Sequence, residues 1–510
     1  MGKKWSPVQN NRFVAPKSRF MSLYQPKTRF NVLKLPLIGP LLRWRWGRLI
    51  FQSVLLIVAV LLLYDGFSGP QFAPENLSTV VTWIHYRGII VFGFLLLGNI
   101  FCMGCPFTMP RTLAKRLAIS GRRWPKFLRN KWLAIGLLFF FFWAYEYFDL
   151  FASPLLTAWV ILGYFIASFF LETIFSESVF CKYVCPLGTF NFVSSTISPL
   201  QITIEDRNVC NTCTGRECLN GTTAMGQPGN PITKNGAVIS LDSIDVLGCG
   251  TELFAPRIKS NLDCTLCLDC VRACPHDNVI LGARNPLKEV KEGTWPARWD
   301  ISFLVLIFTF SALGNAFGMV GPVFQLEAWL ANVLNVQDEA LPLLIIFGVT
   351  NLIMPIGFGL LAAWTSRALA KREEPIRNTL ARYVPAFSPL AFSIWLAHYG
   401  GFHFLGSAAA ISPVFKNFLE DHNIYFLGEP NWTMAAIVPL NWLDPMEMGI
   451  ILVGLLASLY VLGERAKKAK PKKDKTLAQL PWMLLLIGIT VAAFWIFYLP
   501  MEMRGVSIFA

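Results

Sequence analysis

The sequence predicts an all-α polytopic membrane protein with about nine transmembrane helices and one inserted, cysteine-rich cytoplasmic domain. Of its 510 residues, 54% are hydrophobic and 15% are charged, whereas soluble proteins carry about 25% charged residues. Apolar runs long enough to cross about 30 Å of hydrocarbon also recur along the chain. Nine runs are expected to be spans: 49–64, 88–103, 132–151, 155–177, 300–321, 341–364, 386–411, 447–463 and 479–499.

The spans and the cysteines divide the chain into four parts. A basic cytoplasmic tail, 1–48, precedes a four-helix membrane domain, 49–180. The polar stretch 181–299 holds ten of the twelve cysteines and is the one substantial domain expected outside the bilayer. A five-helix membrane domain, 300–510, completes the chain.

The positive charges predict the orientation of the spans. Residues 1–48 carry eleven Lys and Arg and no acid, and the 104–131 loop carries eight and no acid. Such segments stay in the cytoplasm by the positive-inside rule, and we interpret them as topology signals beside anionic lipid rather than as a nucleic-acid site. We therefore expect an integral protein of a bacterial cytoplasmic membrane with its C-terminus outside. The cysteine-rich domain would face the cytoplasm, where reducing conditions keep thiols available for metal.

The domain at 181–299 contains the ligand run of a ferredoxin-type iron–sulfur protein. Its cysteines follow the spacing Cys-x-x-Cys-x-x-Cys-x-x-x-Cys-Pro at Cys264, Cys267, Cys270 and Cys274. In this run three thiolates hold one cluster, and the fourth, before proline, is a ligand of a neighbouring cluster. The motif therefore predicts a ferredoxin-like domain with two [4Fe-4S] clusters and requires a second cysteine set.

That second set lies upstream, as Cys210, Cys213 and Cys218 followed by a single Cys249. If the two halves exchange their fourth ligands, Cys249 completes the cluster of the downstream triplet and Cys274 completes the cluster of the upstream one. A structural zinc site at 210–249 is the alternative, because CxxC pairs also bind zinc.

The other four cysteines form two Cys-Pro motifs, which we expect at the cytoplasmic membrane surface. Cys102 and Cys105 close the second span, and Cys181 and Cys185 close the fourth. Proline directly after the second cysteine of each pair ends the helix and frees backbone N–H groups that can donate to a cluster's sulfurs. The pattern favours a third iron–sulfur or metal centre. A redox-active thiol pair and packed free cysteines remain alternatives.

These motifs together resemble the membrane polyferredoxin family, which includes NapH of periplasmic nitrate reductase systems, the C-terminal region of NosR and the assembly factor CcoG. The resemblance covers about residues 40–290. It rests on Arg43, Arg45 and Arg48 before the first span, the two Cys-Pro motifs, four spans and the two-cluster domain. It implies electron transfer between membrane quinone and a redox partner, with the Cys-Pro motifs needed for activity. The first motif has two residues between its cysteines where the family more often has three, and the five later spans have no counterpart in short members.

Three histidines are candidates for binding haem b or a quinone within the membrane. His398 and His403 lie on the seventh expected span, and His85 lies at the outer end of the second. Five positions apart on an α-helix, His398 and His403 are expected to point in different directions and not to share a metal. His403 and His85 match in depth and would be the pair for a haem. Hydrogen bonding by interfacial histidines is the simpler alternative.

Three carboxylates are candidates for proton transfer with a quinol. Glu146 and Asp149, three apart on the third span, are expected to share one helix face among aromatic residues, where they would serve either as proton acceptors or as part of an interfacial belt. Glu172, near the inner end of the fourth span, would tune the adjacent cysteine centre or pair with a lysine such as Lys182.

The expected function is that of a quinol or quinone oxidoreductase subunit in a larger membrane complex. No nucleotide-phosphate loop or flavin fingerprint is evident in the sequence, so the terminal donor or acceptor would be a cytochrome or iron–sulfur protein on another subunit. No nucleic acid is expected as a partner. A metallocentre assembly or metal-reducing factor resembling CcoG and a redox sensor resembling NosR are the alternatives.

Overall fold

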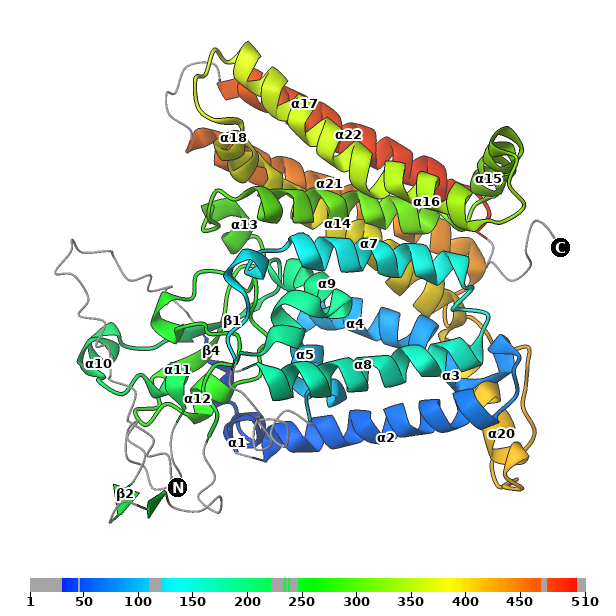
Figure 1. Cartoon of the computed structure of the whole chain (residues 1–510), viewed down its shortest axis with the longest axis horizontal. Coiled ribbons are helices and arrows are strands. Elements are labelled where there is room, and N and C mark those ends of the chain that lie inside the picture. Colours follow the sequence, from blue (N-terminus) through cyan, green and yellow to red (C-terminus); the bar gives the residue numbers. More distant parts are fainter. Residues whose placement is uncertain are drawn as a thin grey trace, which may run out of the picture.

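The computed structural model describes residues 30–44, 46–109, 122–175, 177–221, 233–234, 237–238, 246–468 and 475–501. Most of the N-terminal tail, Arg45 and the end of the C-terminal segment therefore lie outside the described residues. Within them the chain is mostly helical. Long helices run side by side along the longest axis, and short helices and strands gather at one end of this bundle (Figure 1). We call this the cysteine-rich end.

Seven helical segments of the described chain are long and apolar enough to cross a membrane. In the N-terminal half they are α2 (Gly47–Ser68), the composite of α3 (Leu77–Val80), η3 (Val81–Tyr86) and α4 (Arg87–Leu96), and α8 (Pro154–Ile174). In the C-terminal half they are α14 (Trp299–Phe317), the composite of α16 (Ala340–Gly348), η8 (Val349–Ile353) and α17 (Met354–Leu369), α21 (Leu443–Lys467) and α22 (Lys475–Tyr498). The structure is thus that of a polytopic membrane protein.

The two other expected spans are helical but do not form long regular helices. The third is α7 (Trp132–Tyr147), an apolar helix of 16 residues. The seventh is a succession of η9 (Val384–Phe387), α19 (Ser388–Trp395) and η10 (Leu396–Leu405), which are 3-10, α and π helices. Hydropathy locates such segments, but it does not report the changes in helical period within them.

The second span begins and ends earlier in the sequence than expected. It runs over Leu77–Leu96 rather than 88–103. Polar residues at the beginning of this span lower its hydropathy, so the apolar pattern placed the span too late. These residues are nevertheless buried by protein: Ser78 and Thr79 are fully buried, and His85 is 8% exposed. Cys102 consequently lies beyond the span, on a separate short helix, α5 (Ile100–Gly104).

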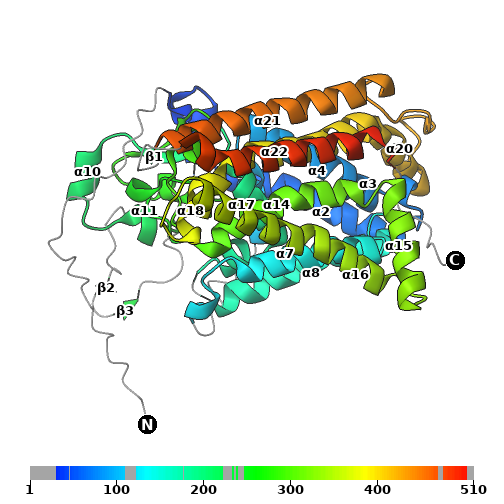
Figure 2. The same cartoon turned by 90° about the horizontal axis from the view of Figure 1, so that it is seen from above.

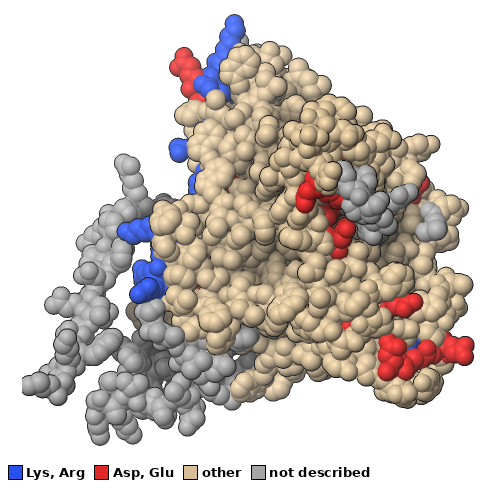
Figure 3. Space-filling view, turned by 45° about the vertical axis from the view of Figure 1, so that its right-hand side comes forward, with Lys and Arg blue, Asp and Glu red and all other residues tan. Residues whose placement is uncertain are grey.

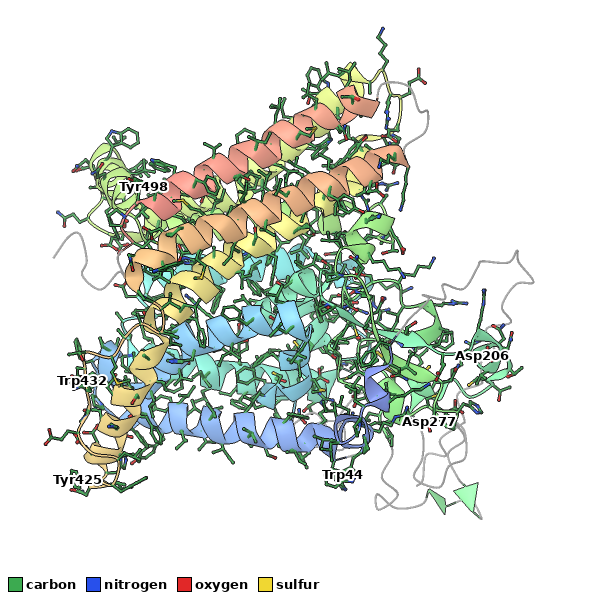
Figure 4. All side chains as sticks on the ribbon, turned by 180° about the vertical axis from the view of Figure 1, so that it is seen from behind. Trp44, Asp206, Asp277, Tyr425, Trp432 and Tyr498 are labelled. Carbon is green, nitrogen blue, oxygen red and sulfur yellow. The ribbon has the colours of Figure 1, made fainter. Side chains whose placement is uncertain are left out.

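The surface of the bundle is divided as a membrane protein's surface should be. On the face shown in Figure 3, a broad uncharged surface lies between an end that carries the Lys and Arg side chains, with an acidic one beside them, and an end where most of the Asp and Glu lie. Aromatic residues lie at both ends, with Trp44 at the cysteine-rich end and Tyr425, Trp432 and Tyr498 at the opposite one (Figure 4). Aromatic side chains are enriched at membrane interfaces.

The largest core lies where the two halves meet. α14 is almost wholly enclosed, because it packs against α7, α17, α19 and α22. Its Phe308 carbonyl accepts a hydrogen bond from the Trp395 indole at 3.1 Å, and Trp395 is fully buried. α21 and α22 run side by side and cover the C-terminal half (Figure 2). α4 packs against η10, which joins the N-terminal half to the C-terminal one.

The cysteine-rich end is built on a small antiparallel sheet. Strand β1 (Leu200–Ile204) pairs with β4 (Val279–Ala283), with Ile202 opposite Leu281. Three short helices lie between them in the sequence, α10 (Arg207–Thr212), α11 (Glu217–Asn220) and α12 (Asp269–Arg272). A second pair, β2 (Thr233–Lys234) and β3 (Ala237–Val238), lies in the 181–299 stretch, of which residues 222–232, 235–236 and 239–245 fall outside the described residues.

Shorter elements complete the described chain. They are η1 (Val32–Lys34), α1 (Ile38–Arg43), η2 (Ala73–Glu75), η4 (Pro106–Thr108), η5 (Lys126–Leu128), η6 (Phe180–Val184), α9 (Pro186–Ser195), η7 (Ala255–Arg257), α13 (Lys288–Glu292), α15 (Gly321–Leu334), α18 (Ile376–Tyr383), η11 (Ala408–Ala410), α20 (Ile411–Asp421) and η12 (Leu440–Trp442).

Candidate metal centres

One group of four cysteines lines a cavity at the cysteine-rich end. Cys210 lies on α10, Cys213 follows it and Cys218 lies on α11, while Cys274 arrives from beyond α12. The rest of the cavity wall is provided by residues around them, including Phe254, Pro256, His276 and Val279. The structure therefore brings the upstream triplet together with the last cysteine of the downstream run.

The other downstream cysteines form a second group with Cys249. Cys264, Cys267 and Cys270 each interact electrostatically with Cys249. The N–H of Cys249 donates to the Cys218 carbonyl at 3.2 Å, so the single cysteine sits directly beside the first group. In each group a triplet from one half of the domain lies with a single cysteine from the other half, as an exchange of fourth ligands requires.

The backbone of the Cys264–Cys270 loop is folded around its thiols. Leu266 and Leu268 adopt left-handed conformations, with φ of 48° and 61°, which residues with a Cβ seldom adopt. These turns direct N–H groups inward, and those of Leu266 and Asp269 donate to the sulfurs of Cys264 and Cys267. Backbone N–H···S bonds of this kind stabilise the negative charge of a thiolate.

Burial keeps these thiols protonated while no metal is bound. It raises the pKa of Cys218 to about 12 and that of Cys267 to about 11, well above the ordinary thiol value. A coordinating metal deprotonates a thiol outright. All twelve cysteines lie in the described chain and none forms a disulfide there.

Thiols are the ligands of both structural zinc ions and iron–sulfur clusters. One zinc ion holds each of four thiolates about 2.3 Å from itself, whereas each iron of a cluster takes its own cysteine. Among the described residues, no three His, Cys, Asp or Glu side chains converge closely enough to hold one metal ion.

The third group, Cys102, Cys105, Cys181 and Cys185, lies inside the helix bundle. Its members interact electrostatically with one another. The Asn191 amide donates to the Cys102 sulfur at 3.2 Å. We call this group the membrane quartet. Its two pairs come from segments 102–105 and 181–185, which precede and follow α8 in the sequence.

The contacts of the membrane quartet place it inside the helix bundle, a short distance from the ends of α2 and α8. The Gln52 amide donates to the Cys105 carbonyl at 3.0 Å, and Gln52 lies about 7 Å along α2 from its first residue at 1.5 Å per residue. Ser168, well inside α8, donates to the Phe107 carbonyl at 2.6 Å. Tyr164, at the middle of α8, interacts electrostatically with Cys105 and Cys185. The quartet is therefore several helical residues deep in the bundle.

A sharp reversal of the chain places the first pair at this depth. After α4 ends, Gly98 adopts a φ of 77°, and α5 turns back into the bundle. A Cβ at Gly98 would lie 2.9 Å from the Ser198 hydroxyl, so only glycine fits this turn. Non-helical backbone at membrane depth is tolerated where protein surrounds it, and the 98–108 segment is surrounded by α2, α4 and α8.

The prolines act at the start of the following helices, not at the end of the preceding ones. Pro106 begins η4 and Pro186 begins α9, because proline is suited to the first position of a helix. The Gly188 N–H donates to the Cys185 sulfur at 3.1 Å. The N–H groups available to the sulfurs are therefore those of helix N-termini.

Two residues connect the membrane quartet to the Cys249 group: Arg48, which the sequence analysis used only for the family resemblance, and Asn99, which it missed. Arg48 binds the Asp269 carboxylate at 3.0 Å through Nη1 and donates to the Met103 carbonyl at 3.1 Å through Nε. The Asn99 amide donates to the Cys264 carbonyl at 3.1 Å and also bonds to the Cys102 sulfur. The sequence signal for these residues was a polar side chain inside an apolar run, as for Asn99, or directly before one, as for Arg48.

The candidate carboxylates have different surroundings. Glu146 is a buried residue of α7, and its carboxylate lies against Gly318. Asp149 does not share its helix face, because α7 ends at Tyr147 and Asp149 adopts a left-handed φ of 43° in the following turn. Glu172 is 2% exposed and interacts electrostatically with Cys181. Lys182 donates instead to the Thr251 carbonyl at 2.8 Å.

The histidines are paired differently from the expectation. The rings of His398 and His403 are in contact, with centroids 4.7 Å apart. The expectation that they diverge was wrong, because η10 is a π-helix, whose longer turn places residues five apart on one face. The two ring nitrogens of His85 lie 3.0 Å and 2.9 Å from the Val80 and Ala408 carbonyls, so its ring joins neighbouring segments of backbone.

Comparison with known proteins gives no match: no family model matches the chain, and neither a curated protein nor a solved structure matches it.

Proposed function

We propose that this protein is a membrane electron-transfer subunit that moves electrons between the quinone pool and a partner redox protein. In this proposal Cys264, Cys267, Cys270 and Cys249 hold one [4Fe-4S] cluster of a ferredoxin-like domain. A second cluster is held by Cys210, Cys213, Cys218 and Cys274, and the membrane quartet holds a third iron–sulfur centre. Such clusters supply one-electron carriers.

The observation that carries the proposal is the composition of the two soluble groups. Each triplet is completed by a cysteine from the other half, and Cys274 lines the cavity of Cys210, Cys213 and Cys218. A zinc knuckle does not need that exchange, whereas the two-cluster ferredoxin run does. The N–H···S bonds at Cys264 and Cys267 give further support.

A membrane quinone is the substrate class that suits the position of the third group. A quinone stays in the bilayer, and the membrane quartet is deep among the spanning helices, beside α2 and α8. Arg48 and Asn99 join this group to the Cys249 group through direct hydrogen bonds. The resemblance of the Cys-Pro motifs to the membrane polyferredoxin family agrees with the same assignment.

The burial of the quartet disfavours the alternative of a metal-delivery factor. Delivery of an ion to a partner needs ligands that the partner can reach, but Cys105 and Cys185 are buried and Cys102 and Cys181 are only partly exposed. We therefore assign the quartet to electron transfer. A metal-reducing factor predicts instead that iron or copper in the quartet is released to a partner protein.

Metal analysis of the purified full-length protein tests the proposal. We expect about eight iron and eight acid-labile sulfide per chain for two clusters, and about twelve of each if the quartet holds a third. Stoichiometric zinc in place of iron would contradict the proposal.

Two serine variants test the exchange of ligands, each cluster serving as the control for the other. Cys274→Ser should change the electron paramagnetic resonance signal of the cluster held by Cys210, Cys213 and Cys218 and leave the other signal intact. Cys249→Ser should do the reverse. Loss of the same signal in both variants would show that the halves do not exchange their fourth ligands.

A further inference from the structure

A cluster of buried polar side chains lies where α4, α7, α14 and η10 meet, remote from the soluble cysteine groups. It consists of His398 and His403 on η10, Arg87 at the start of α4, Tyr399, and Asn315 on α14. His398 is fully buried and His403 is 1% exposed. Ionisable groups within spanning segments are costly and mark functional sites.

The two histidines lack hydrogen-bond partners. Of the groups that the structure describes, none accepts from or donates to any of their four ring nitrogens. A buried polar group without a partner costs about 1–3 kcal/mol, and the surroundings include the apolar rings of Phe402 and Phe497. The π-helical turn that brings the rings within 4.7 Å is itself rare and concentrated at functional sites. A ligand with hydrogen-bonding groups would satisfy these ring nitrogens.

The charge of Arg87 restricts the charge that this ligand can carry. Its guanidinium lies 4.6 Å, 4.5 Å and 4.8 Å from the ring centroids of Trp83, Tyr145 and Tyr399. Its positive charge acts on both His398 and His403. This charge acts against a metal cation between the imidazoles, and the Glu146 carboxylate, which interacts electrostatically with Arg87, offsets part of it. A neutral ligand with oxygen acceptors would be attracted to the same group.

The cluster is also close to the membrane quartet. Tyr86, the residue before Arg87, packs its ring 4.7 Å from that of Phe101, the neighbour of Cys102. The Tyr86 side chain interacts electrostatically with Cys102, Cys105 and Cys185. A ligand bound to the buried histidines would therefore lie within the bundle, beside the quartet.

We propose that His398, His403 and Arg87 bind the headgroup of a membrane quinone. A quinone ring is planar and apolar, as the aromatic walls require, and it presents an oxygen at each end. In the oxidised ligand the carbonyl oxygens accept hydrogen bonds from an imidazole N–H and from the guanidinium. In the reduced ligand the hydroxyl groups donate to an imidazole nitrogen. This inference rests on the proposed function for its choice of ligand, because a quinone is the substrate class assigned to the chain.

Direct binding to the full-length protein in lipid nanodiscs tests the inference. The probe is decylubiquinone, with menadione as a second ring type, and the dissociation constant is measured by equilibrium partition. His398→Leu, His403→Leu and Arg87→Leu should each weaken binding at least tenfold, which is about 1.4 kcal/mol. His398→Gln and His403→Gln retain a donor and an acceptor and should lose less affinity than the leucine variants. His422→Gln is the matched control, since His422 lies on the exposed end of α20 and bonds to Tyr64.

Photochemical cross-linking locates the ligand independently of affinity. An azido-substituted quinone should label peptides that contain residues 396–405, and excess decylubiquinone should suppress the label. Labelling elsewhere, or leucine variants that bind as tightly as the wild type, would overturn the inference. Stoichiometric copper or zinc that disappears in His398→Leu and His403→Leu while quinone affinity is unchanged would also overturn it.

The same samples separate this inference from the proposed function. Iron and sulfide content and the dithionite-reduced spectrum report the clusters, and they also show that each variant is folded. Intact clusters with no quinone binding at the histidines would refute the inference alone. Quinone binding that depends on the histidines in a protein without iron would support the inference and refute the proposed function.

Discussion

Arg48 should set the reduction potential of the cluster assigned to Cys264, Cys267, Cys270 and Cys249. Its side chain is 14% exposed and bridges the Asp269 carboxylate and the Met103 carbonyl. It also interacts electrostatically with Cys267. A fixed positive charge favours the reduced, more negative state of a nearby cluster. Replacement by a neutral residue should therefore lower the potential.

The size of the effect follows from Coulomb's law. Asp269 precedes Cys270 in the chain, and consecutive Cα atoms are 3.8 Å apart, so the guanidinium is on the order of 8 Å from the cluster position. With an effective dielectric constant of about 20, one charge at that distance is worth about 2 kcal/mol. For a one-electron couple this is roughly 90 mV. Asp269 keeps a partner after the substitution, because Arg272 binds it at 2.9 Å.

Redox titration followed by electron paramagnetic resonance measures this shift. In Arg48→Gln we expect the midpoint of this cluster to fall by about 50–90 mV, the lower figure allowing for water that enters the site. Arg48→Lys keeps the charge and should stay within about 20 mV of the wild type. Arg43→Gln is the surface control, since its partner Asp277 has a 77% exposed side chain and solvent screens such pairs. A midpoint that is unchanged or raised in Arg48→Gln, with iron content preserved, would refute the reasoning.

Two further substitutions test packing around the centres. In Gly188→Ala the new Cβ would lie 2.9 Å from the Cys181 carbonyl oxygen, so we expect loss of the third centre and a fall from about twelve to about eight iron per chain. Gly163→Ala, with nothing within 4 Å of the added carbon, should keep the full iron content, and equal losses in both variants would contradict the explanation. Arg465 is buried at the end of α21 and donates to the Val290 carbonyl at 2.7 Å. Arg465→Met should lower the free energy of unfolding by about 3 kcal/mol, because hydrogen bonds from a charged group are lost, and an unchanged thermal midpoint would contradict this.

The sequence was sufficient for the main features of the membrane fold. Seven of the nine expected spans are helices of spanning length, since a run of apolar residues has few alternatives in lipid. It was insufficient where protein, not lipid, surrounds the helix. Residues 77–87 contain Ser78, Thr79 and Arg87, whose polar groups are buried against other helices, so hydropathy placed the second span too late. No local pattern reports that neighbouring helices enclose a segment.

The cysteine groups show the same division between local and long-range information. The spacing of Cys264, Cys267, Cys270 and Cys274 predicted that Cys274 would leave its own triplet, and the structure places it with Cys210. The depth of the membrane quartet was not predictable from spacing. It depends on the reversal at Gly98, which contacts Ser198 and Leu266 from the distant domain. Similarly, the contact of His398 with His403 depends on a π-helical turn that sequence periodicity did not indicate.

Polar residues near the Cys-Pro motifs could nevertheless have indicated the depth. Gln52 lies five residues inside α2, in an otherwise apolar run, and a lone amide there requires a partner within the bundle. Its partners are the Cys105 carbonyl and the Thr108 hydroxyl at 3.0 Å and 2.9 Å. A free carbonyl at membrane depth exists only where the backbone is not helical. Thus a buried glutamine in one span and a Cys-Pro segment after another together imply that the segment re-enters the bundle, which links the first span directly to the position of the third centre.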